Sequence, residues 1–201
     1  MALHEHFALD VHDLLQEDPG HWDRMIAADL AAELKDLLGE EPCGIPEIRR
    51  FLAVKGLRAL KAYLQEAVAG KTGEAAVRAV IHGMRDFAHL RPGISAATFR
   101  SAMTDSPEWR RAAADLADWL ATLLADIGLT ASSGQDALRL IRAFVRGFVI
   151  HEMQGSFIDN ADLDDSFAFG VEILLRGLKG GEIATAPRID SHRRSDAAGN
   201  A

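Results

Sequence analysis

The 201-residue chain has a single cysteine, Cys43, so it cannot form an internal disulfide bond. One lone thiol suits a protein of the reducing cytoplasm. The first ten residues, MALHEHFALD, lack the basic stretch and the apolar core of a signal peptide. No uncharged apolar run approaches the roughly 20 residues that a membrane-spanning helix needs. These absences predict a soluble cytoplasmic protein that has no membrane partner.

Basic residues are scarce at the start of the chain. Residues 1–44 contain eleven acidic residues and only two basic ones, which is a formal net charge of −9. The whole chain has a net charge of −8, so the remainder is nearly neutral. Because an acidic surface repels phosphate, residues 1–44 are poorly suited to nucleic-acid binding. The residues predicted to contact phosphate lie after this segment and are Arg49, Arg50 and Lys55. The alternative is that these three residues form a solvated helix face.

Residue patterns of catalytic and metal sites are also lacking. His151 and Glu152 stand side by side, as in the H-E-x-x-H helix of zinc proteases, but the required second histidine is replaced by Gly155. On a helix these two side chains point about 100° apart, so they do not form an acid–base pair. No Ser/His/Asp or Cys/His spacing stands out either. We therefore predict no enzyme activity, no metal site and no cofactor.

Apolar residues recur at intervals of three and four along most of the chain, which is the spacing of amphipathic helices. Alternating strand patterns are missing, so we predict an all-α protein. About seven helices are expected, near 22–38, 46–69, 77–88, 95–103, 107–127, 133–154 and 164–178. The clearest helix start is Ser106-Pro107-Glu108, since serine suits the cap, proline the first position and glutamate the first turn. Residues 181–201 lack apolar periodicity and are predicted to be a disordered tail.

The helix expected at 133–154 is apolar on more than one side. One side carries Phe144 and Phe148, and a second side about a quarter-turn away carries Val145 and Val149. Such a helix packs against its own core and against something else. The opposite side holds three arginines, namely Arg139, Arg142 and Arg146.

The helix expected at 164–178 likewise has apolar side chains beside its main stripe. That stripe is predicted to be Phe167, Val171, Leu174 and Leu178. Surplus apolar surface on two late helices predicts that two chains associate through a four-helix interface. A central helix buried within a monomer is the alternative. The predicted interface residues are Leu138, Val145, Val149 and Leu175.

Aromatic and methionine side chains gather on the inner faces of three expected helices, where acidic residues are few. This is the usual lining of a small-molecule site. A close-packed core without a cavity is the alternative. The predicted lining is Phe87, Phe99, Met103, Trp119, Phe144 and Phe148, with His82 or His151 as the polar contact.

Several segments occur in an order that matches a known family. GIPEIRRFLAVKGLRALKAYLQEA starts at residue 44, LRLIRAFVRGFVIHEMQGSF at residue 138 and DDSFAFGVEILLRGL at residue 164. In order and spacing, residues 44–178 resemble the TetR/AcrR family of transcriptional regulators, in particular the C-terminal regulatory domain called WHG.

The resemblance implies an all-α fold, a homodimer through the last two helices and a small-molecule pocket between the middle ones. In this family an N-terminal helix-turn-helix binds operator DNA, and a ligand changes the separation of the two reading heads. Residues 1–44 lack the family's reading-helix pattern, which is similar to PSLYxH. We therefore expect an atypical acidic helical segment there, and a ligand-binding and dimerisation domain at 45–180.

The function that the resemblance implies is a TetR-like transcriptional regulator that responds to a small apolar effector. The alternative is a ligand-binding helical dimer without DNA-binding activity.

Overall fold

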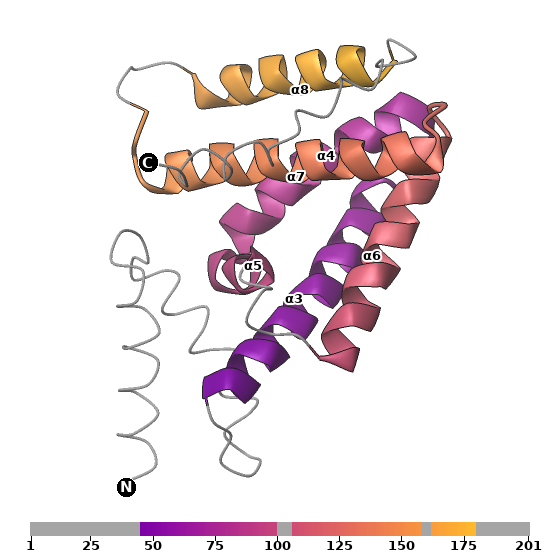
Figure 1. Cartoon of the computed structure of the whole chain (residues 1–201). Coiled ribbons are helices and arrows are strands. Elements are labelled where there is room, and N and C mark those ends of the chain that lie inside the picture. Colours follow the sequence, from indigo (N-terminus) through magenta and orange to yellow (C-terminus); the bar gives the residue numbers. More distant parts are fainter. Residues whose placement is uncertain (1–44, 100–105, 158–161, 180–201) are drawn as a thin grey trace, which may run out of the picture.

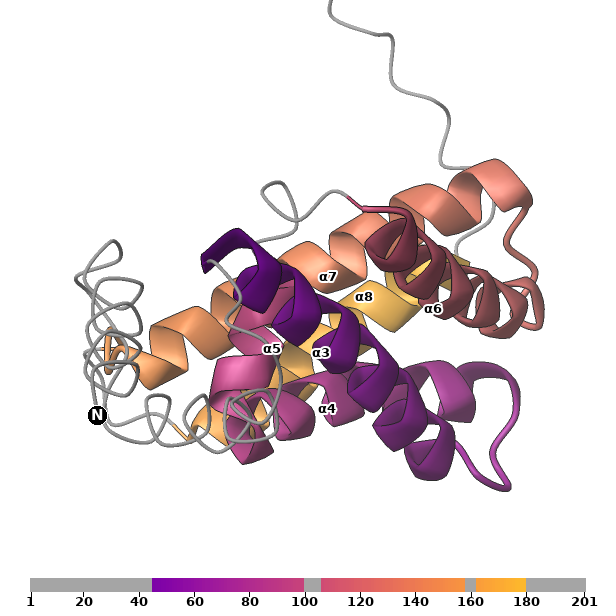
Figure 2. The same ribbon diagram turned by 90° about the horizontal axis from the view of Figure 1, so that it is seen from below.

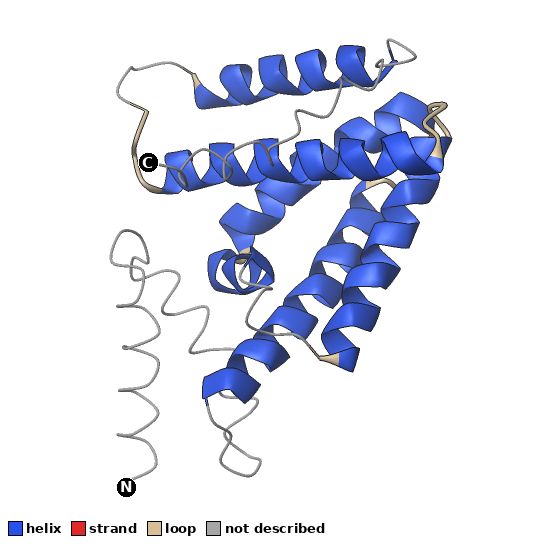
Figure 3. Cartoon of the chain, viewed as in Figure 1, coloured by secondary structure: helices blue, strands red, loops and turns tan. Residues whose placement is uncertain are grey.

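The computed structural model describes residues 45–99, 106–157 and 162–179. These ranges form six helices and no strand (Figures 1 and 3). The all-α prediction is therefore confirmed for this part of the chain. The helix expected at 22–38, the acidic segment 1–44 and the tail 181–201 lie outside the described residues. The helices are α3 (Ile45–Ala67), α4 (Gly73–Leu90), α5 (Pro92–Phe99), α6 (Pro107–Ala125), α7 (Ala131–Met153) and α8 (Leu163–Lys179).

Helix α4 is central, because it contacts each of the other five helices. On one side of it, α3 and α6 run side by side in the same direction, and the short α5 packs against α3 and α4 (Figure 1). On the other side, α7 and α8 run antiparallel (Figure 1). In the view from below, α8 lies behind the other helices (Figure 2), where it contacts α4 and α7.

Local sequence signals explain where α6 and α7 begin. The Ser106 hydroxyl accepts a hydrogen bond from the Trp109 backbone N–H at 3.1 Å, and Pro107 follows at the first position, so the predicted cap is confirmed. Helix α7 begins at Ala131, two residues earlier than expected. Its cap is Thr130, whose hydroxyl accepts from the Ser133 backbone N–H at 3.3 Å.

Helix α5 begins at Pro92 rather than at the predicted residue 95. The preceding helix, α4, ends at Leu90, two residues beyond the expected end at 88. Proline also suits the first turn of a helix, since it has no N–H that needs an acceptor there. Pro92 therefore starts the next helix directly, and this brings α5 close against α3. At that contact, a Cβ atom on Gly56 would lie only 2.8 Å from the carbonyl oxygen of Ile94.

The core runs through all the long helices, and its largest fully buried side chains include Leu64, Ile81, Leu124, Ile141 and Phe167. Helix α7 buries a single stripe with a spacing of four residues, which is Ala137, Ile141, Val145 and Val149. Helix α8 buries Phe167, Val171, Leu175 and Leu178. The predicted α8 stripe was wrong at one position, because Leu175 is 1% exposed and Leu174 is only half-buried.

Candidate functional site

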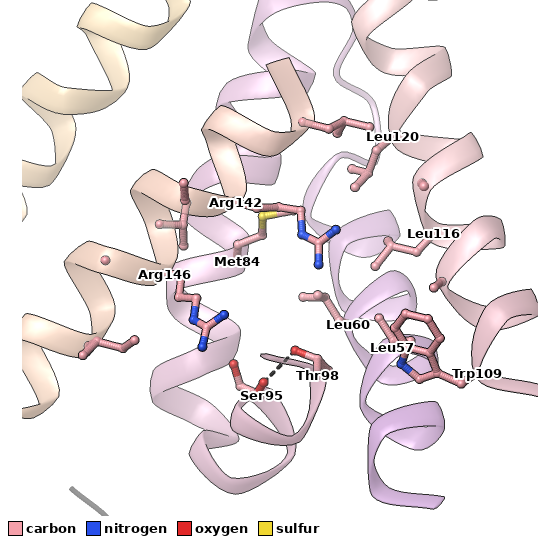
Figure 4. Close-up of a pocket in the computed structure, with 17 residues that line it drawn as sticks. Leu57, Leu60, Met84, Ser95, Thr98, Trp109, Leu116, Leu120, Arg142 and Arg146 are labelled. Atoms are coloured by element: carbon pink, nitrogen blue, oxygen red, sulfur yellow. Dashed lines mark hydrogen bonds between the residues drawn. The ribbon is translucent and has the colours of Figure 1, made fainter. Parts of the chain in front are cut away.

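A cavity of about 560 Å³ lies between α3, α4, α5, α6 and α7 (Figure 4). This volume falls within the roughly 300–1,000 Å³ that is usual for small-molecule sites. Every one of the five helices contributes to its walls, which are mostly apolar. The larger apolar side chains of the walls include Leu57, Leu60, Met84, Leu116, Leu120, Leu138 and Ile150.

Few polar groups line this cavity. Helix α5 contributes Ser95 and Thr98, both buried, and the Thr98 hydroxyl donates a hydrogen bond to the Ser95 carbonyl oxygen at 2.6 Å. Helix α6 contributes Trp109, whose indole N–H is buried and has no hydrogen-bond partner in the described part of the chain. A buried donor without an acceptor is unfavourable, so an acceptor that reached Trp109 would stabilise this end of the cavity.

Two arginines of α7, Arg142 and Arg146, supply the charge of the cavity. Both residues are exposed, and both guanidinium groups extend from α7 into the space in front of α5 (Figure 4). None of the described residues that line the cavity is acidic. Like charges four residues apart destabilise an isolated helix by about 0.2–0.5 kcal/mol. The cavity therefore combines an apolar interior with a positively charged margin.

Arg139, one turn earlier on α7, differs from Arg142 in its ion pairing. Arg139 forms an ion pair with Asp136 at 2.5 Å and does not line the cavity. Within the described ranges, Arg142 forms no ion pair. The charge of Arg142 is consequently available to a bound molecule, whereas that of Arg139 is already balanced within its helix.

A second cluster of charged groups lies around Glu152, near the C-terminal end of α7. Arg85 of α4 donates two hydrogen bonds to the Glu152 carboxylate, from Nε at 3.0 Å and from Nη2 at 2.5 Å. His89 lies 3.1 Å from the same carboxylate, and Asp164 lies 2.7 Å from Arg85. The Arg85 guanidinium also stacks 4.8 Å from the centre of the Phe167 ring.

This arrangement settles the role of the adjacent histidine and glutamate. Glu152 is nearly buried and is held by Arg85, and the hydrogen bond to Glu152 is the main reason why the pKa of Arg85 is raised. His151 is exposed and lies against Phe157, with ring centres 5.7 Å apart. The predicted divergence of His151 and Glu152 is confirmed. Among the described residues, no group of three or more His, Cys, Asp and Glu side chains is placed to hold a metal ion.

Residues 77–174, which span nearly all of α4 through most of α8, match the family model of the tetracyclin repressor-like C-terminal domain. This match supports a TetR-type C-terminal domain in that part of the chain. A comparison with curated protein sequences finds no match. None of the helices of this domain that the structure describes is long and apolar enough to cross a membrane.

Within the TetR-type domain, the aromatic side chains predicted to line the pocket form a close-packed cluster instead. His82, Phe144 and Phe148 surround Phe167 of α8, with ring centres 5.4, 5.2 and 5.1 Å from its own. Burial lowers the pKa of His82. The cluster lies between α4, α7 and α8, whereas the cavity borders α5 and α6, so these three residues do not line it.

The remaining predicted lining residues are also elsewhere. Phe87 is buried against Tyr63, with ring centres 5.7 Å apart, and Trp119 packs half-buried against the core. Neither of them, nor His151, lines the cavity. Met103 and the side chain of Phe99 lie outside the described residues. The structure thus places the pocket between the middle helices, but with a different set of side chains from the predicted one.

The predicted interface residues of α7 and α8 lie inside the domain. Val145, Val149 and Leu175 are 4%, 1% and 1% exposed within one chain, and Leu138 lines the cavity. The apolar side chains that do face outward are different: Leu140 of α7 is 51% exposed, while Phe169 and Ile173 of α8 are 69% and 55% exposed. The exposed apolar surface of α7 and α8 is therefore made of residues other than the predicted ones.

The residues predicted to contact phosphate belong to α3. Arg50 is half-buried, and its Nε atom has no hydrogen-bond partner among the described residues. The Lys55 ammonium lies 5.8 Å from the centre of the Phe51 ring. The side chain of Arg49 lies outside the described part of the chain.

Proposed function

We propose that this protein is a TetR-like transcriptional regulator whose C-terminal domain binds a small effector and forms a homodimer. The cavity of about 560 Å³ is the observation behind the proposal. Apart from Leu57 and Leu60 of α3, the residues that line it belong to the part of the chain that matches the TetR-type domain, and it has the size and apolar walls of a ligand site. The side chains that line it include no His, Cys, Asp or Glu in the described ranges. Ser95 and Thr98 thus have no general base beside them in the cavity, which favours binding over catalysis.

The effector site is tested with N-phenyl-1-naphthylamine, a neutral dye that fluoresces in apolar surroundings. We expect the dye to bind, and Ala117→Trp to weaken its binding by at least about tenfold because an indole fills the cavity that Ala117 lines. Ala121→Trp is the matched control, since Ala121 is exposed on the same helix and does not line the cavity. Equal dye binding by both variants would contradict the proposed site.

Dimerisation is proposed through α7 and α8, and the support is their outward apolar surface. Phe169 and Ile173 are one turn apart on α8 and are both more than half exposed. We expect light scattering to report a dimer at micromolar concentration, and Phe169→Glu with Ile173→Glu to report a monomer, because buried unpaired charge is strongly unfavourable. Leu90→Glu, at an exposed position at the end of α4, is the control that keeps the dimer.

Regulation through DNA is the third part of the proposal, and a gel shift with the upstream DNA of its own gene tests it. Phosphate contacts weaken steeply as salt rises, so a specific shift at low salt that fades at moderate salt is the expected result. The second candidate is a ligand-binding helical dimer without DNA-binding activity. The net charge of −9 in residues 1–44 favours that candidate. A folded dimer that gives no shift at low salt would leave only this second function.

A further inference from the structure

We propose that the effector is an uncharged amphipathic molecule that carries a hydroxyl group, held between the Ser95 and Thr98 side chains of α5, and a hydrocarbon body that lies along α6 and α7. This inference rests on the proposed effector site and assigns the chemical class of its ligand.

The lining of the cavity is polar toward one end. Ser95 and Thr98 come from the short helix α5, and with Trp109 at the start of α6 they lie toward the lower end of the cavity in Figure 4. Farther along α6 the wall is apolar, since Leu116 and Leu120 line it there. A molecule with one polar end and one hydrocarbon end fits this lining, because burying polar groups without partners is unfavourable.

The two α5 hydroxyl groups offer a donor and an acceptor to the same ligand atom. Ser95 and Thr98 are three residues apart, so their side chains lie on one face of the helix. The Thr98 hydroxyl donates its hydrogen to the Ser95 carbonyl oxygen at 2.6 Å, and its own oxygen remains able to accept. For the Ser95 hydroxyl, the described residues provide no partner, so its hydrogen is available. A hydroxyl group of the ligand can therefore accept from Ser95 and donate to Thr98 at once.

The same inventory of donors and acceptors disfavours an anionic group at this position. A carboxylate only accepts hydrogen bonds. Helix α5 would offer it a single hydrogen, from Ser95, beside two further acceptors, which are the Thr98 hydroxyl oxygen and the Ser95 carbonyl oxygen. The Trp109 N–H needs an acceptor but no charge, so an uncharged oxygen suits it equally well.

The two arginines of the lining do not require an anion either. Arg146 already interacts with another group of the protein. Arg142 is exposed, so water solvates its charge and an ion pair there would contribute little. Both positive charges repel a cationic ligand, which leaves an uncharged polar group as the best match.

The experiment compares 1-octanol, its isomer heptyl methyl ether, and octanoate. The ether has the same atoms as octanol but no hydrogen to donate. Each ligand displaces N-phenyl-1-naphthylamine from the purified full-length protein at about pH 8, where octanoate is ionised. We expect octanol to displace the dye at a concentration about fivefold lower than the ether, which corresponds to the net contribution of one hydrogen bond. Octanoate should need a higher concentration than octanol.

Variants assign the effect to the α5 hydroxyl groups. Thr98→Val keeps the shape of the side chain but removes the acceptor, so octanol should lose its advantage over the ether. Ser95→Ala removes the donor that both oxygens use, so it should weaken octanol and the ether by about the same factor. Dye binding should stay within about twofold in both variants because the apolar walls are intact, and this also shows that they fold.

Thr122→Val is the matched control. The Thr122 hydroxyl also donates to a carbonyl oxygen three residues earlier, that of Trp119, but Thr122 is exposed and does not line the cavity. This variant should keep the full preference for octanol.

The outcomes separate this inference from the proposed function. A protein that binds the dye in the cavity but releases it equally well to octanol and to the ether retains its effector site and overturns the hydroxyl assignment. Displacement by octanoate at a lower concentration than octanol overturns the uncharged class. A preference for octanol that persists in Thr98→Val overturns the assignment to α5. Failure of the dye and of all three ligands to bind would overturn the proposed effector site and this inference together.

Discussion

Removing the charge of Glu152 tests how far the fold depends on the cluster that joins α4, α7 and α8. The perturbation is Glu152→Gln, which keeps the shape of the side chain but removes the negative charge opposite Arg85 and replaces one of the two acceptor oxygens that Arg85 and His89 share with an NH2 donor. The side chains of Glu152 and Arg85 are 7% and 12% exposed, so the arginine charge would be left almost buried.

The magnitude follows from the surroundings of Arg85. Breaking a buried ion pair by removing one partner typically costs about 3–5 kcal/mol. Asp164 stays 2.7 Å from Arg85, but its side chain is 84% exposed, so it offsets only a small part of this loss. We therefore expect Glu152→Gln to lower the free energy of unfolding by about 2–4 kcal/mol.

The assay is urea unfolding with linear extrapolation, at one fixed protein concentration because dimerisation would couple stability to concentration. Glu172→Gln is the matched control. Glu172 also binds an arginine of α4, Arg78, but its side chain is 42% exposed, so its loss should cost less than about 1 kcal/mol.

A double-variant cycle decides whether Arg85 and Glu152 act as a pair. Replacing both with methionine removes the two charges together, so no unpaired charge remains in the core. We expect the loss in free energy of unfolding of this double variant to be smaller than the sum of the losses of the two single methionine variants. The difference should be at least about 1–2 kcal/mol. Additive losses, or a Glu152→Gln effect no larger than that of Glu172→Gln, would refute the reasoning.

Two further predictions concern the contact between α7 and α8 and the histidine beside it. Gly170→Ala should lower the free energy of unfolding by about 1–3 kcal/mol, because the new Cβ would lie 2.5 Å from the Phe144 ring, whereas Gly177→Ala meets open space and should be neutral or stabilising in the same urea titration. Burial lowers the pKa of His82, so the unfolded state takes up a proton first as pH falls below the ordinary value of 6.5, and stability should fall in that window. The measurement is the urea midpoint at about pH 8 and about pH 5.5. His82→Gln should remove the loss of stability at the lower pH, and His151→Gln, at an exposed position, should leave it unchanged. A loss that persists in His82→Gln would contradict the prediction.

Helix starts and ends were predictable from the sequence because they depend on neighbouring residues. The cap at Ser106 needs only the Ser-Pro-Glu order, and the glycines after α6 and α7 adopt positive φ angles of 91° and 59° where those helices end. The start of α5 was less predictable, since Pro92 both follows one helix and begins another. The position of this start also brings α5 close to Gly56 of α3. That approach is a tertiary contact, so no local sequence pattern predicts it.

The candidate site was harder to predict, because a helical projection gives the direction of a side chain but not what stands opposite. Phe144 and Phe148 were correctly expected to face inward, yet the neighbour they meet is Phe167 rather than a cavity. The sequence correctly predicted that Arg142 lies on the side of α7 away from its apolar faces. Residues of α5 and α6 lie opposite that side, however, so Arg142 lines the cavity. One signal was available: Glu152 continues an apolar stripe, and a buried carboxylate requires a cationic partner such as Arg85.

Helix α7 contributes side chains to two separate surroundings, and the two sets of residues alternate along its sequence. Leu138, Arg142 and Ile150 face the cavity, while Phe144 and Phe148 face the ring cluster that holds α8. Under the proposed function, selection for a new effector would act on the first set, and selection for an intact fold would act on the second. Because the two sets project to different sides, substitutions at the cavity would change ligand contacts without loosening α8, so the proposed ligand preference could diversify while the architecture stays the same.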